Sequence, residues 1–282
     1  MNYDHRAVRA LIIRIVRFCF RVYPFLHGRG WILRAARLLL GRAPVRFDIG
    51  GGTFIEGPLS DYVIVWTFMH AHDRDAPFQH SLALVGAGDT VVDIGANVGI
   101  WSLLAAKRGA RVHAFEPVPA LAERLRAHVA GTTVVVHEIA LAAEEGSRPF
   151  FAVPDGNTGA SSLSRRDGSV EIRVQSTTLD AVVDRADLLK VDVEGAELLV
   201  FRGAWRLLSS DDAPIVFFEI DEILCNAFGV TTPEVKRFLA GCGYGIYRWD
   251  GRAYAPVPLD ERHGHEDLFA LKPRHVAKMS NA

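Results

Sequence analysis

The stretch VVDIGANVG, residues 91–99, decides the fold of this chain. Apolar residues flank Asp93, and Gly95, Asn97 and Gly99 follow within six positions. A buried strand that runs into a glycine-containing loop is typical of a strand–helix–strand unit with a ligand at the loop. Most such loops bind phosphate, but an aspartate at the loop entrance would repel phosphate in a site of low dielectric. The stretch therefore predicts a ligand site for something other than a phosphate.

The pattern of apolar strands and amphipathic helices around this stretch predicts an α/β fold with a mostly parallel sheet. Strands are expected at 90–94, 111–116, 133–140, 188–191, 215–219, 245–249 and 268–271, with helices near 100–108, 120–130, 196–208 and 233–240. Two further strands, 149–153 and 170–175, flank a turn-rich loop.

Ligands of such sheets bind outside the carboxyl ends of the strands. The residues at these ends are Asp93, Glu116, Ala140, Asp192 and Glu219. Four of these five are acidic, which favours a cationic or hydroxyl-rich ligand.

The loop departs from the dinucleotide-binding fingerprint in one place, because Asn97 stands where that fingerprint has its middle glycine. Glu116 supplies the later acid, which can accept hydrogen bonds from both hydroxyls of a ribose. S-adenosylmethionine fits these features because it carries a ribose, a sulfonium and an ammonium group but no phosphate. In this interpretation Asp93 favours the positive charges, and the Asn97 side chain hydrogen bonds near the methionine end.

The sequence resembles the FkbM-type family of S-adenosylmethionine-dependent methyltransferases. The resemblance covers about residues 80–222 and is carried by VVDIGANVGIWSLLAA (91–106), VHAFEPVPALAERL (112–125), VVHEIALAAEEG (135–146), TTLDAVV (177–183), LLKVDVEGAELLVFRGA (188–204) and IVFFEI (215–220). It implies a class I methyltransferase fold, with a seven-stranded sheet whose last strand is antiparallel. It also implies methyl transfer to hydroxyl oxygens of natural products, sugars or glycans.

The resemblance assigns roles residue by residue. Cofactor-binding roles fall on Asp93, Gly95, Asn97 and Gly99 in the first loop, on Glu116 at the ribose, and on Glu138 and Ala140 beside the adenine. Asp192 and Glu194 match the family's Asp-x-Glu-Gly signature.

Asp192, Glu194 and Glu219 are the candidate catalytic residues. A general base beside an acceptor hydroxyl would take its proton, and Asp192 at a strand end is the first choice. The alternatives are that Asp192 caps the next helix or contacts only the cofactor, and that Glu194 only complements the helix dipole. Glu219 can contact the acceptor or share a divalent metal with Asp192, but no metal is assigned because two carboxylates are too few ligands.

The first fifty residues differ in charge from the rest of the chain. They hold ten Arg and two Asp, a net charge of +8, while the remainder carries 22 Lys and Arg against 31 Asp and Glu, a net charge of −9. Arg6, Arg9, Arg14, Arg17 and Arg21 share one side of a helical wheel, opposite an apolar side. One interpretation is contact of residues 6–22 with an anionic membrane surface. The other is a helix packed on the domain or a partner, with its arginines in solvent.

We therefore expect a basic helical extension over 1–44, an FkbM-type domain over 45–273, and a frayed tail over 274–282. A hairpin of strands at 45–54 and 62–68 is expected at the domain's edge. Three cysteines without metal-site spacing, and no uncharged apolar run of roughly 18 residues, favour a cytoplasmic protein, either free or peripheral on the inner membrane face.

The predicted function is S-adenosylmethionine-dependent O-methylation of a hydroxyl on a saccharide, glycan or secondary metabolite. A nicotinamide-dependent oxidoreductase is one alternative, and a non-enzymatic methyltransferase-like scaffold docked by the Arg-rich helix is another. A nucleic-acid acceptor is not expected, because the catalytic part of the chain is acidic.

Overall fold

A computed structural model describes residues 5–22, 26–41, 43–50, 52–70, 76–153, 156–165 and 168–280, and within it the chain divides into two units. The first unit comprises Met1–Arg74 and Pro154–Gly159, and the second comprises Asp75–Val153 and Ala160–Ala282. This division falls thirty residues beyond the boundary expected after residue 44. The hairpin expected at the edge of the methyltransferase domain therefore belongs to the first unit.

The first unit, in its described part, contains α1 (His5–Val22), α2 (Leu26–Leu40), β1 (Val45–Asp48), β2 (Phe54–Gly57) and α3 (Tyr62–His70). The strands β1 and β2 pair antiparallel, with Val45 opposite Gly57. The Asp48 carboxylate closes their turn by accepting a hydrogen bond of 2.8 Å from the Gly50 amide.

The segment expected as a strand at 62–68 is the helix α3, which corrects the sequence-based prediction. Its β-branched residues favour a strand, but Ile64, Val65 and Phe68 are buried at helical spacing. Asp61 precedes the helix and accepts a hydrogen bond from the Val63 amide, as an N-terminal cap does. Packing and capping together override the local propensity.

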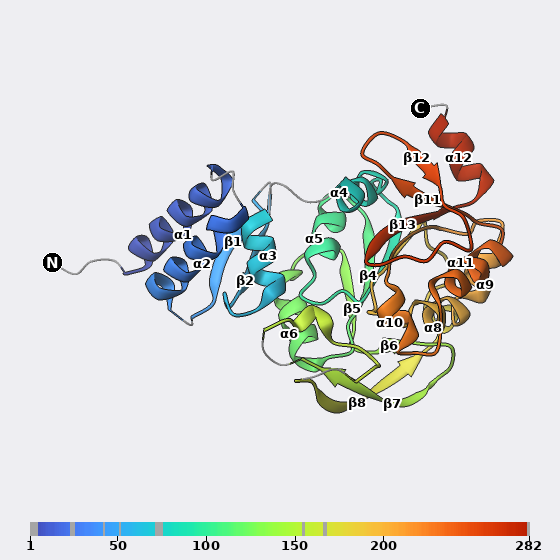
Figure 1. The fold of residues 1–282 in the computed structure, drawn as a ribbon, viewed down its shortest axis with the longest axis horizontal. Helices are drawn as coiled ribbons and strands as arrows, with labels where there is room; N and C mark the ends of the chain where they lie inside the picture. The colour runs from blue at the N-terminus through green and yellow to red at the C-terminus, as the bar shows by residue number, and fades with distance from the viewer. Residues whose placement is uncertain are drawn as a thin grey trace. The chain divides into compact units, whose positions relative to one another are not determined.

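The second unit contains the remaining elements (Figure 1). Its helices are α4 (Ala76–Ala83), α5 (Ile100–Lys107), α6 (Pro119–His128), α7 (Leu179–Val182), α8 (Glu197–Arg202), α9 (Trp205–Ser209), α10 (Glu222–Asn226), α11 (Thr232–Gly241) and α12 (Pro273–Ser280). The strands of its central sheet are β3 (Thr90–Ile94), β4 (Arg111–Phe115), β5 (Val134–His137), β9 (Leu188–Val191), β10 (Ile215–Ile220), β11 (Gly245–Trp249), β12 (Tyr254–Pro256) and β13 (Glu266–Leu271).

The central sheet has the strand order β12-β11-β13-β10-β9-β3-β4-β5. Strands β5, β4, β3, β9 and β10 are parallel, whereas β13 runs antiparallel to both β10 and β11. This is the expected class I methyltransferase sheet with an antiparallel last strand, extended by the short edge strand β12. The strand order reverses between β3 and β9, and ligands bind such sheets at this switch point.

Helices cover both faces of the sheet. On one face, sheet residues such as Val92 and Leu189 pack with residues of α7, α8, α9 and α11. On the other, Val91 and Leu188 pack with residues of α4 and α5, and Phe217 and Phe269 pack near α12. Because neighbouring residues of each strand face opposite layers, both faces of the central strands are apolar.

A second, three-stranded sheet corrects the expected third strand at 133–140. That strand ends at His137, and the chain then enters β6 (Ala140–Leu141), which pairs with β8 (Val170–Thr177). The strand β7 (Gly146–Ala152) pairs antiparallel with β8 on its other side. The short helix η1 (Thr158–Ala160) lies in the loop that joins β7 to β8.

The predicted frayed tail over 274–282 is also corrected, because α12 is helical up to Ser280 and only residues 281–282 lie outside the described part. Among the described residues, no helix combines the length and the apolar character needed to cross a bilayer.

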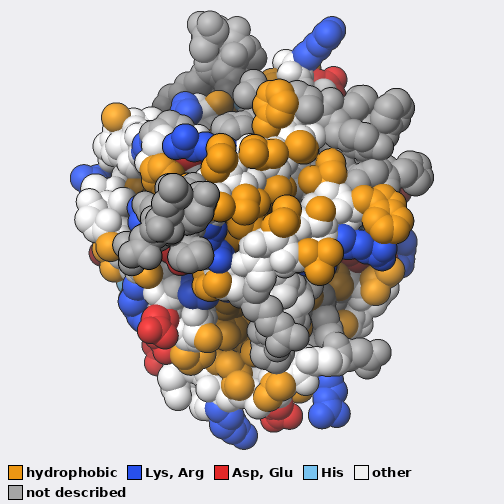
Figure 2. Space-filling view, turned by 90° about the vertical axis from the view of Figure 1, so that its left-hand side faces the viewer, with side chains coloured by type: hydrophobic (Ala, Val, Ile, Leu, Met, Phe, Trp, Pro, Cys, Tyr) orange, Lys and Arg blue, Asp and Glu red, His pale blue; other side chains and the backbone are white. Residues whose placement is uncertain are grey.

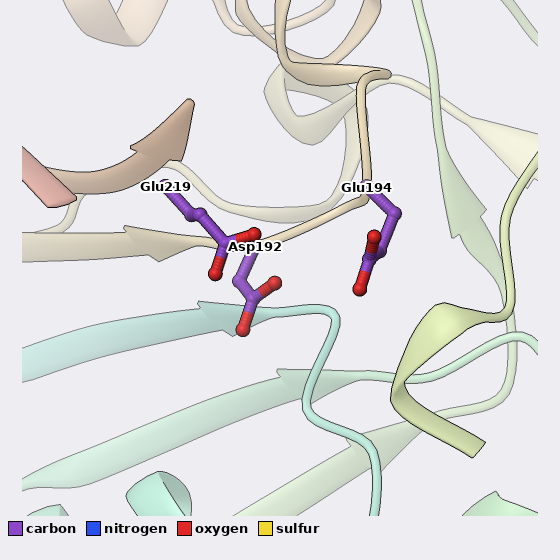
Figure 3. A group of neighbouring side chains, drawn as sticks. All are labelled: Asp192, Glu194 and Glu219. Carbon is purple, nitrogen blue, oxygen red and sulfur yellow. The ribbon is translucent and has the colours of Figure 1, made fainter. Parts of the chain in front are cut away.

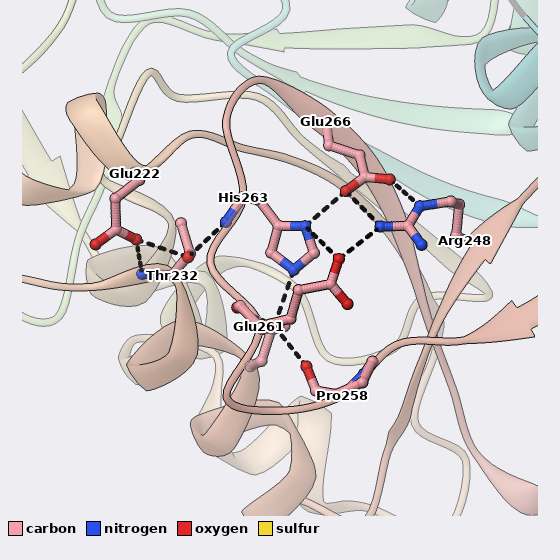
Figure 4. Close-up of polar contacts among 8 residues, drawn as sticks. Glu222, Thr232, Arg248, Pro258, Glu261, His263 and Glu266 are labelled. Carbon is pink, nitrogen blue, oxygen red and sulfur yellow. Dashed lines mark hydrogen bonds and ion pairs between the residues drawn. The ribbon is translucent and has the colours of Figure 1, made fainter.

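Buried Lys236 of α11 holds the loop before β13 in place. Figure 4 shows the polar contacts around His263 of this loop. The Lys236 ammonium donates to two backbone carbonyls of that loop and lies 2.8 Å from Nε2 of His263. Because an ammonium can only donate, Nε2 accepts, and Nδ1 donates to Glu266 over 2.6 Å. These bonds fix the segment that carries His265 to the end of the sheet.

Candidate active site

The loop after β3 is shaped by three residues with positive φ. Gly95 has a φ of 79°, and a Cβ there would lie 1.8 Å from the carbonyl oxygen of Asp192. Gly99 has a φ of 85°, and its Cβ would lie 2.2 Å from the Leu125 side chain. Asn97 has a φ of 51°, which asparagine tolerates better than most residues. The two glycines thus let the loop turn directly against the ends of the neighbouring elements.

Glu116 supports this loop through hydrogen bonds to its side chain. Its side chain is buried, and its two oxygens accept hydrogen bonds of 2.9 Å from the amides of Asn97 and Val118. Burial raises the pKa of Glu116 to about 7, although these hydrogen bonds oppose the shift. Each oxygen retains a second lone pair, so Glu116 can accept from ribose hydroxyls while it supports the loop.

Asp93 lies elsewhere than the sequence pattern predicted. Its side chain is fully buried beneath the loop, where it accepts from Ser102 Oγ at 2.6 Å and lies 3.2 Å from the Lys190 ammonium. A buried carboxylate needs such a partner, because an unpaired charge is costly there. Asp93 is therefore paired with Lys190, a contact that the sequence pattern did not predict.

Lys190 connects the ends of β3 and β9. Its ammonium lies 3.2 Å from Asp93 and 3.2 Å from Asp192, and it donates to the Gly95 carbonyl at 3.3 Å. Burial alone would lower the pKa of Lys190, but the two aspartates raise it further than burial lowers it. Lys190 was not among the predicted site residues, although a lysine inside the apolar strand LLKV was a usable signal.

The three predicted catalytic residues meet at the carboxyl ends of β9 and β10 (Figure 3). One carboxylate oxygen from each of Asp192, Glu194 and Glu219 lies within 4.8 Å of the other two. Asp192 makes no capping bond to α8, whose N-cap residue is Ala196, and is held by Lys190 instead. The alternative of Asp192 as a helix cap therefore does not hold.

A tight turn presents Glu194 to this cluster. Glu194 has a φ of 57°, and Gly195 has a φ of 101° at a point where a Cβ would lie 2.4 Å from the Leu224 carbonyl oxygen. The Gly195 amide donates to the Glu197 carboxylate at 3.0 Å. Glu197 is the last acid of the Lys-x-Asp-x-Glu-Gly-Ala-Glu motif, and its carboxylate stabilises the turn by accepting this hydrogen bond. The motif contains it, but the sequence alone gave it no role.

Burial raises the pKa of two further acids in this region. The pKa of Glu197 is raised to about 7 by burial first, and then by the negative charges of Glu219 and Asp192. The pKa of Glu219 is raised by burial and by Asp192, against the opposing effect of His265. The cluster therefore contains an acid that binds a proton more readily than an ordinary glutamate does.

His265 is a site residue that no sequence pattern indicated. Its Nδ1 lies 3.3 Å from Glu219 Oε1, and this contact raises the pKa of His265 to about 9. No motif marks His265, because it reaches Glu219 only through the pairing of β13 with β10.

The structure separates Glu138 and Ala140 from the predicted strand end. Glu138 follows β5 and forms an ion pair with Arg126 at 2.8 Å, and Ala140 is buried in the small sheet. His137 occupies the strand end instead, stacked on the Phe115 ring at a centroid distance of 4.4 Å.

Carboxylates are also the ligands that divalent cations prefer, and the three acids of the cluster could supply one ligand atom each. Such cations take six or more ligands, and an acidic cluster alone does not define a metal site. The same carboxylates can also bind a hydroxyl group and take up its proton.

Comparisons with known proteins agree with this geometry. Residues 93–246 match the methyltransferase FkbM domain. Methyltransferase sdnD of Sordaria araneosa is 28% identical over 221 residues, which cover 63% of this chain and 81% of that protein. Hexuronic acid methyltransferase AglP of Haloferax volcanii is 32% identical over 157 residues, which cover 54% of this chain and 62% of that protein.

Solved methyltransferase structures resemble the chain more distantly. Aeropyrum pernix fibrillarin with bound S-adenosyl-L-methionine has a TM-score of 0.41 at 14% identity, with 70% of this chain and 76% of that chain covered. A TehB-like methyltransferase of Corynebacterium glutamicum also has a TM-score of 0.41 at 14% identity, with coverages of 74% and 94%. At these scores the structural neighbours add nothing to the sequence matches.

Proposed function

Because the chain belongs to the FkbM family of S-adenosylmethionine-dependent methyltransferases, we propose that it methylates a hydroxyl oxygen of a saccharide, glycan or secondary metabolite. Membership of this family argues against the two alternative functions, a nicotinamide-dependent oxidoreductase and a scaffold without activity. The observation that supports the hydroxyl acceptor is the cluster of Asp192, Glu194 and Glu219 beside the cofactor loop.

The loop at 95–99 and Glu116 fit S-adenosylmethionine. The glycines allow close approach of the backbone, and the buried carboxylate of Glu116 suits the ribose hydroxyls. When bound, the cofactor supplies a methyl carbon on a positively charged sulfur. Acids around such a ligand stabilise its charge, whereas they would repel a pyrophosphate.

The protein's contribution is to orient the acceptor and to remove its proton. Asp192 is fixed by Lys190, which suits it to orient the hydroxyl. Glu219 has a raised pKa, and a base is most effective when its pKa lies near the working pH. Glu219 would take up the hydroxyl proton, and S-adenosylmethionine held by the loop at 95–99 and by Glu116 would supply the methyl group to the hydroxyl oxygen. Sequence reasoning favoured Asp192 as the base, and the structure favours this division of roles.

Single substitutions in the cluster test these roles. Asp192→Asn and Glu219→Gln should each lower kcat by about 10²–10⁴-fold, because orientation or proton removal is lost. Both variants should keep the affinity for S-adenosylmethionine, measured by calorimetry. Exposed Asp184 and Glu171 offer matched controls, and Asp184→Asn and Glu171→Gln should leave kcat unchanged. A cluster variant that retains the wild-type rate would contradict the assignment.

The acceptor is tested with a methyl-labelled cofactor and a panel of hexuronic acid oligosaccharides, neutral sugars and hydroxylated metabolites. Hexuronic acids come first because AglP is a hexuronic acid methyltransferase. An ether formed at a hydroxyl survives mild alkali, whereas an ester formed at a carboxyl group is hydrolysed. Label that alkali releases, or that mass spectrometry places on nitrogen, would refute O-methylation of a hydroxyl.

A further inference from the structure

An apolar surface of the first unit lies in solvent. On α1, Val8, Leu11, Ile15 and Phe18 are 45%, 57%, 52% and 63% exposed. On α2, Trp31, Leu38 and Leu39 are 70%, 85% and 64% exposed. We call these seven residues the apolar face. Figure 2 shows hydrophobic side chains gathered on the face that it draws. Exposed apolar patches of this kind mark sites of protein or membrane interaction.

The orientation of α1 is opposite to that of a helix packed by its apolar side. Arg9 donates to the carbonyls of Leu40, Ala43 and Pro44 at 2.8–3.0 Å. The Arg17 guanidinium lies over the Phe47 and Phe68 rings at 5.4 and 5.9 Å. Two arginines of the basic side, Arg9 and Arg17, thus contact the first unit itself, whereas Arg14 is exposed.

Arginines accompany the apolar face along α1 and α2. Residues 5–40 contain eight arginines and no acidic residue. Arg14 is exposed beside the α1 stripe, and the Arg34 guanidinium lies 4.9 Å from the Trp31 ring centroid. Apolar and aromatic side chains next to arginines are typical of helices that lie in the interface of an anionic membrane. A symmetric contact between two copies would instead bring two arginine-rich surfaces together with no acid to pair them.

We propose that the apolar face docks α1 and α2 on an anionic lipid surface. Leu11, Ile15, Phe18 and Trp31 enter the boundary between headgroups and acyl chains, and Arg14 and Arg34 contact the lipid phosphates. This docking is independent of the methyl-transfer reaction and of the acceptor.

Vesicle flotation of the full chain tests the proposal. The protein should float with vesicles of phosphatidylcholine and phosphatidylglycerol, and much less with phosphatidylcholine alone. Raised salt should weaken the binding, because it screens the arginines. Leu11→Ser and Phe18→Ser should each weaken it at least about tenfold, since each methylene removed from the membrane costs about fourfold in affinity. Arg14→Gln should weaken binding to the anionic vesicles only.

Ile223 of the second unit is the matched control, because it is apolar and 80% exposed but lies outside the apolar face. Ile223→Ser should leave flotation unchanged. All the substituted apolar side chains are exposed, so thermal unfolding should match wild type; Leu38→Ser, at an 85% exposed position, replaces any variant that does not fold. Three outcomes would overturn the proposal: no flotation with either vesicle, flotation that the serine variants retain, or a wild-type dimer in solution that Leu11→Ser dissociates.

Discussion

At the scale of a single residue, Lys190 makes the site rigid. Its charge is buried and shared between Asp93, which is also buried, and the partly exposed Asp192. Removal of one member of a buried charged group typically costs about 3–5 kcal/mol, because the remaining charge loses its partner. Lys190 thereby ties the loop after β3 to the end of β9, and the proposed catalytic cluster keeps a fixed position relative to the proposed cofactor loop.

Glu197 makes the stability of the protein depend on pH. Its pKa is raised from an ordinary value of 4.5 to about 7, so between these values the folded protein keeps a proton that the unfolded chain releases. Stability is therefore highest below the lower value and falls as the pH rises through the higher one. Glu197→Gln removes this loss, so between about pH 5 and about pH 8 the variant should gain roughly 2 kcal/mol relative to wild type.

Urea unfolding of both proteins at the two pH values measures this gain. Glu171→Gln is the control, since Glu171 lies exposed on β8 and should show the same pH dependence as wild type. If the unfolding free energies of Glu197→Gln and wild type change in parallel with pH, Glu197 is ionised at both values and the raised pKa is wrong.

Individual site residues differed in how far the sequence predicted them. Gly95, Asn97 and Gly99 stand out in the sequence, and the structure gives each of them a positive φ, a conformation that few residues adopt. The direction of the Asp93 side chain was not predictable, since it depends on Lys190, a partner ninety-seven positions away in the chain. His265 was missed for the same reason, as only strand pairing brings it to Glu219.

The conformation of the loop after β3 depends on the close approach of this loop to the end of β9. Gly95→Ala places a Cβ 1.8 Å from a backbone oxygen, so the loop must move away from the site. We expect at least about tenfold weaker binding of S-adenosylmethionine and a clear loss of stability, measured by calorimetry and urea unfolding. The physical reason is that the displaced loop no longer fits the cofactor. Each tenfold loss of affinity corresponds to about 1.4 kcal/mol of binding free energy.

Gly131 is the control position that distinguishes the effect of this steric crowding from the effect of backbone strain. It has a φ of 78°, close to that of Gly95, but an added Cβ would meet nothing within 4 Å. Gly131→Ala should cost only the left-handed conformation itself, about 1–2 kcal/mol, and leave cofactor affinity intact. Equal effects of the two alanines on affinity would show that the approach to Asp192 does not matter.

Elements with a clear period were predicted well, and those decided by tertiary packing were not. The strands β3, β4, β9 and β10 are short apolar runs between helices, a pattern that few other arrangements share. The segment of α3 is apolar throughout, so its sequence carries no period that separates helix from strand. The end of β5 was placed too late because the apolar Ile139 and Ala140 follow it and lead into a different sheet.

Across the chain as a whole, the strand order of the central sheet could be predicted from the alternation of strands and helices and from the family resemblance. The division of the chain did not, because residues 45–70 carry no linker composition and their packing with α1 and α2 is a tertiary property. The short segment Pro154–Gly159 also joins the first unit, which no local pattern indicates.

The second unit should fold and bind its cofactor without residues 1–74. The three hydrophobic clusters around its sheet are built from residues of the second unit, between Phe78 and Val276. The cofactor loop, Glu116 and the catalytic cluster also lie within it. The truncated chain should therefore show cooperative urea unfolding and wild-type affinity for S-adenosylmethionine by calorimetry, while its flotation with anionic vesicles is lost. Non-cooperative unfolding, or loss of cofactor binding in a folded truncated chain, would show that the first unit is part of the catalytic domain rather than a separate docking module.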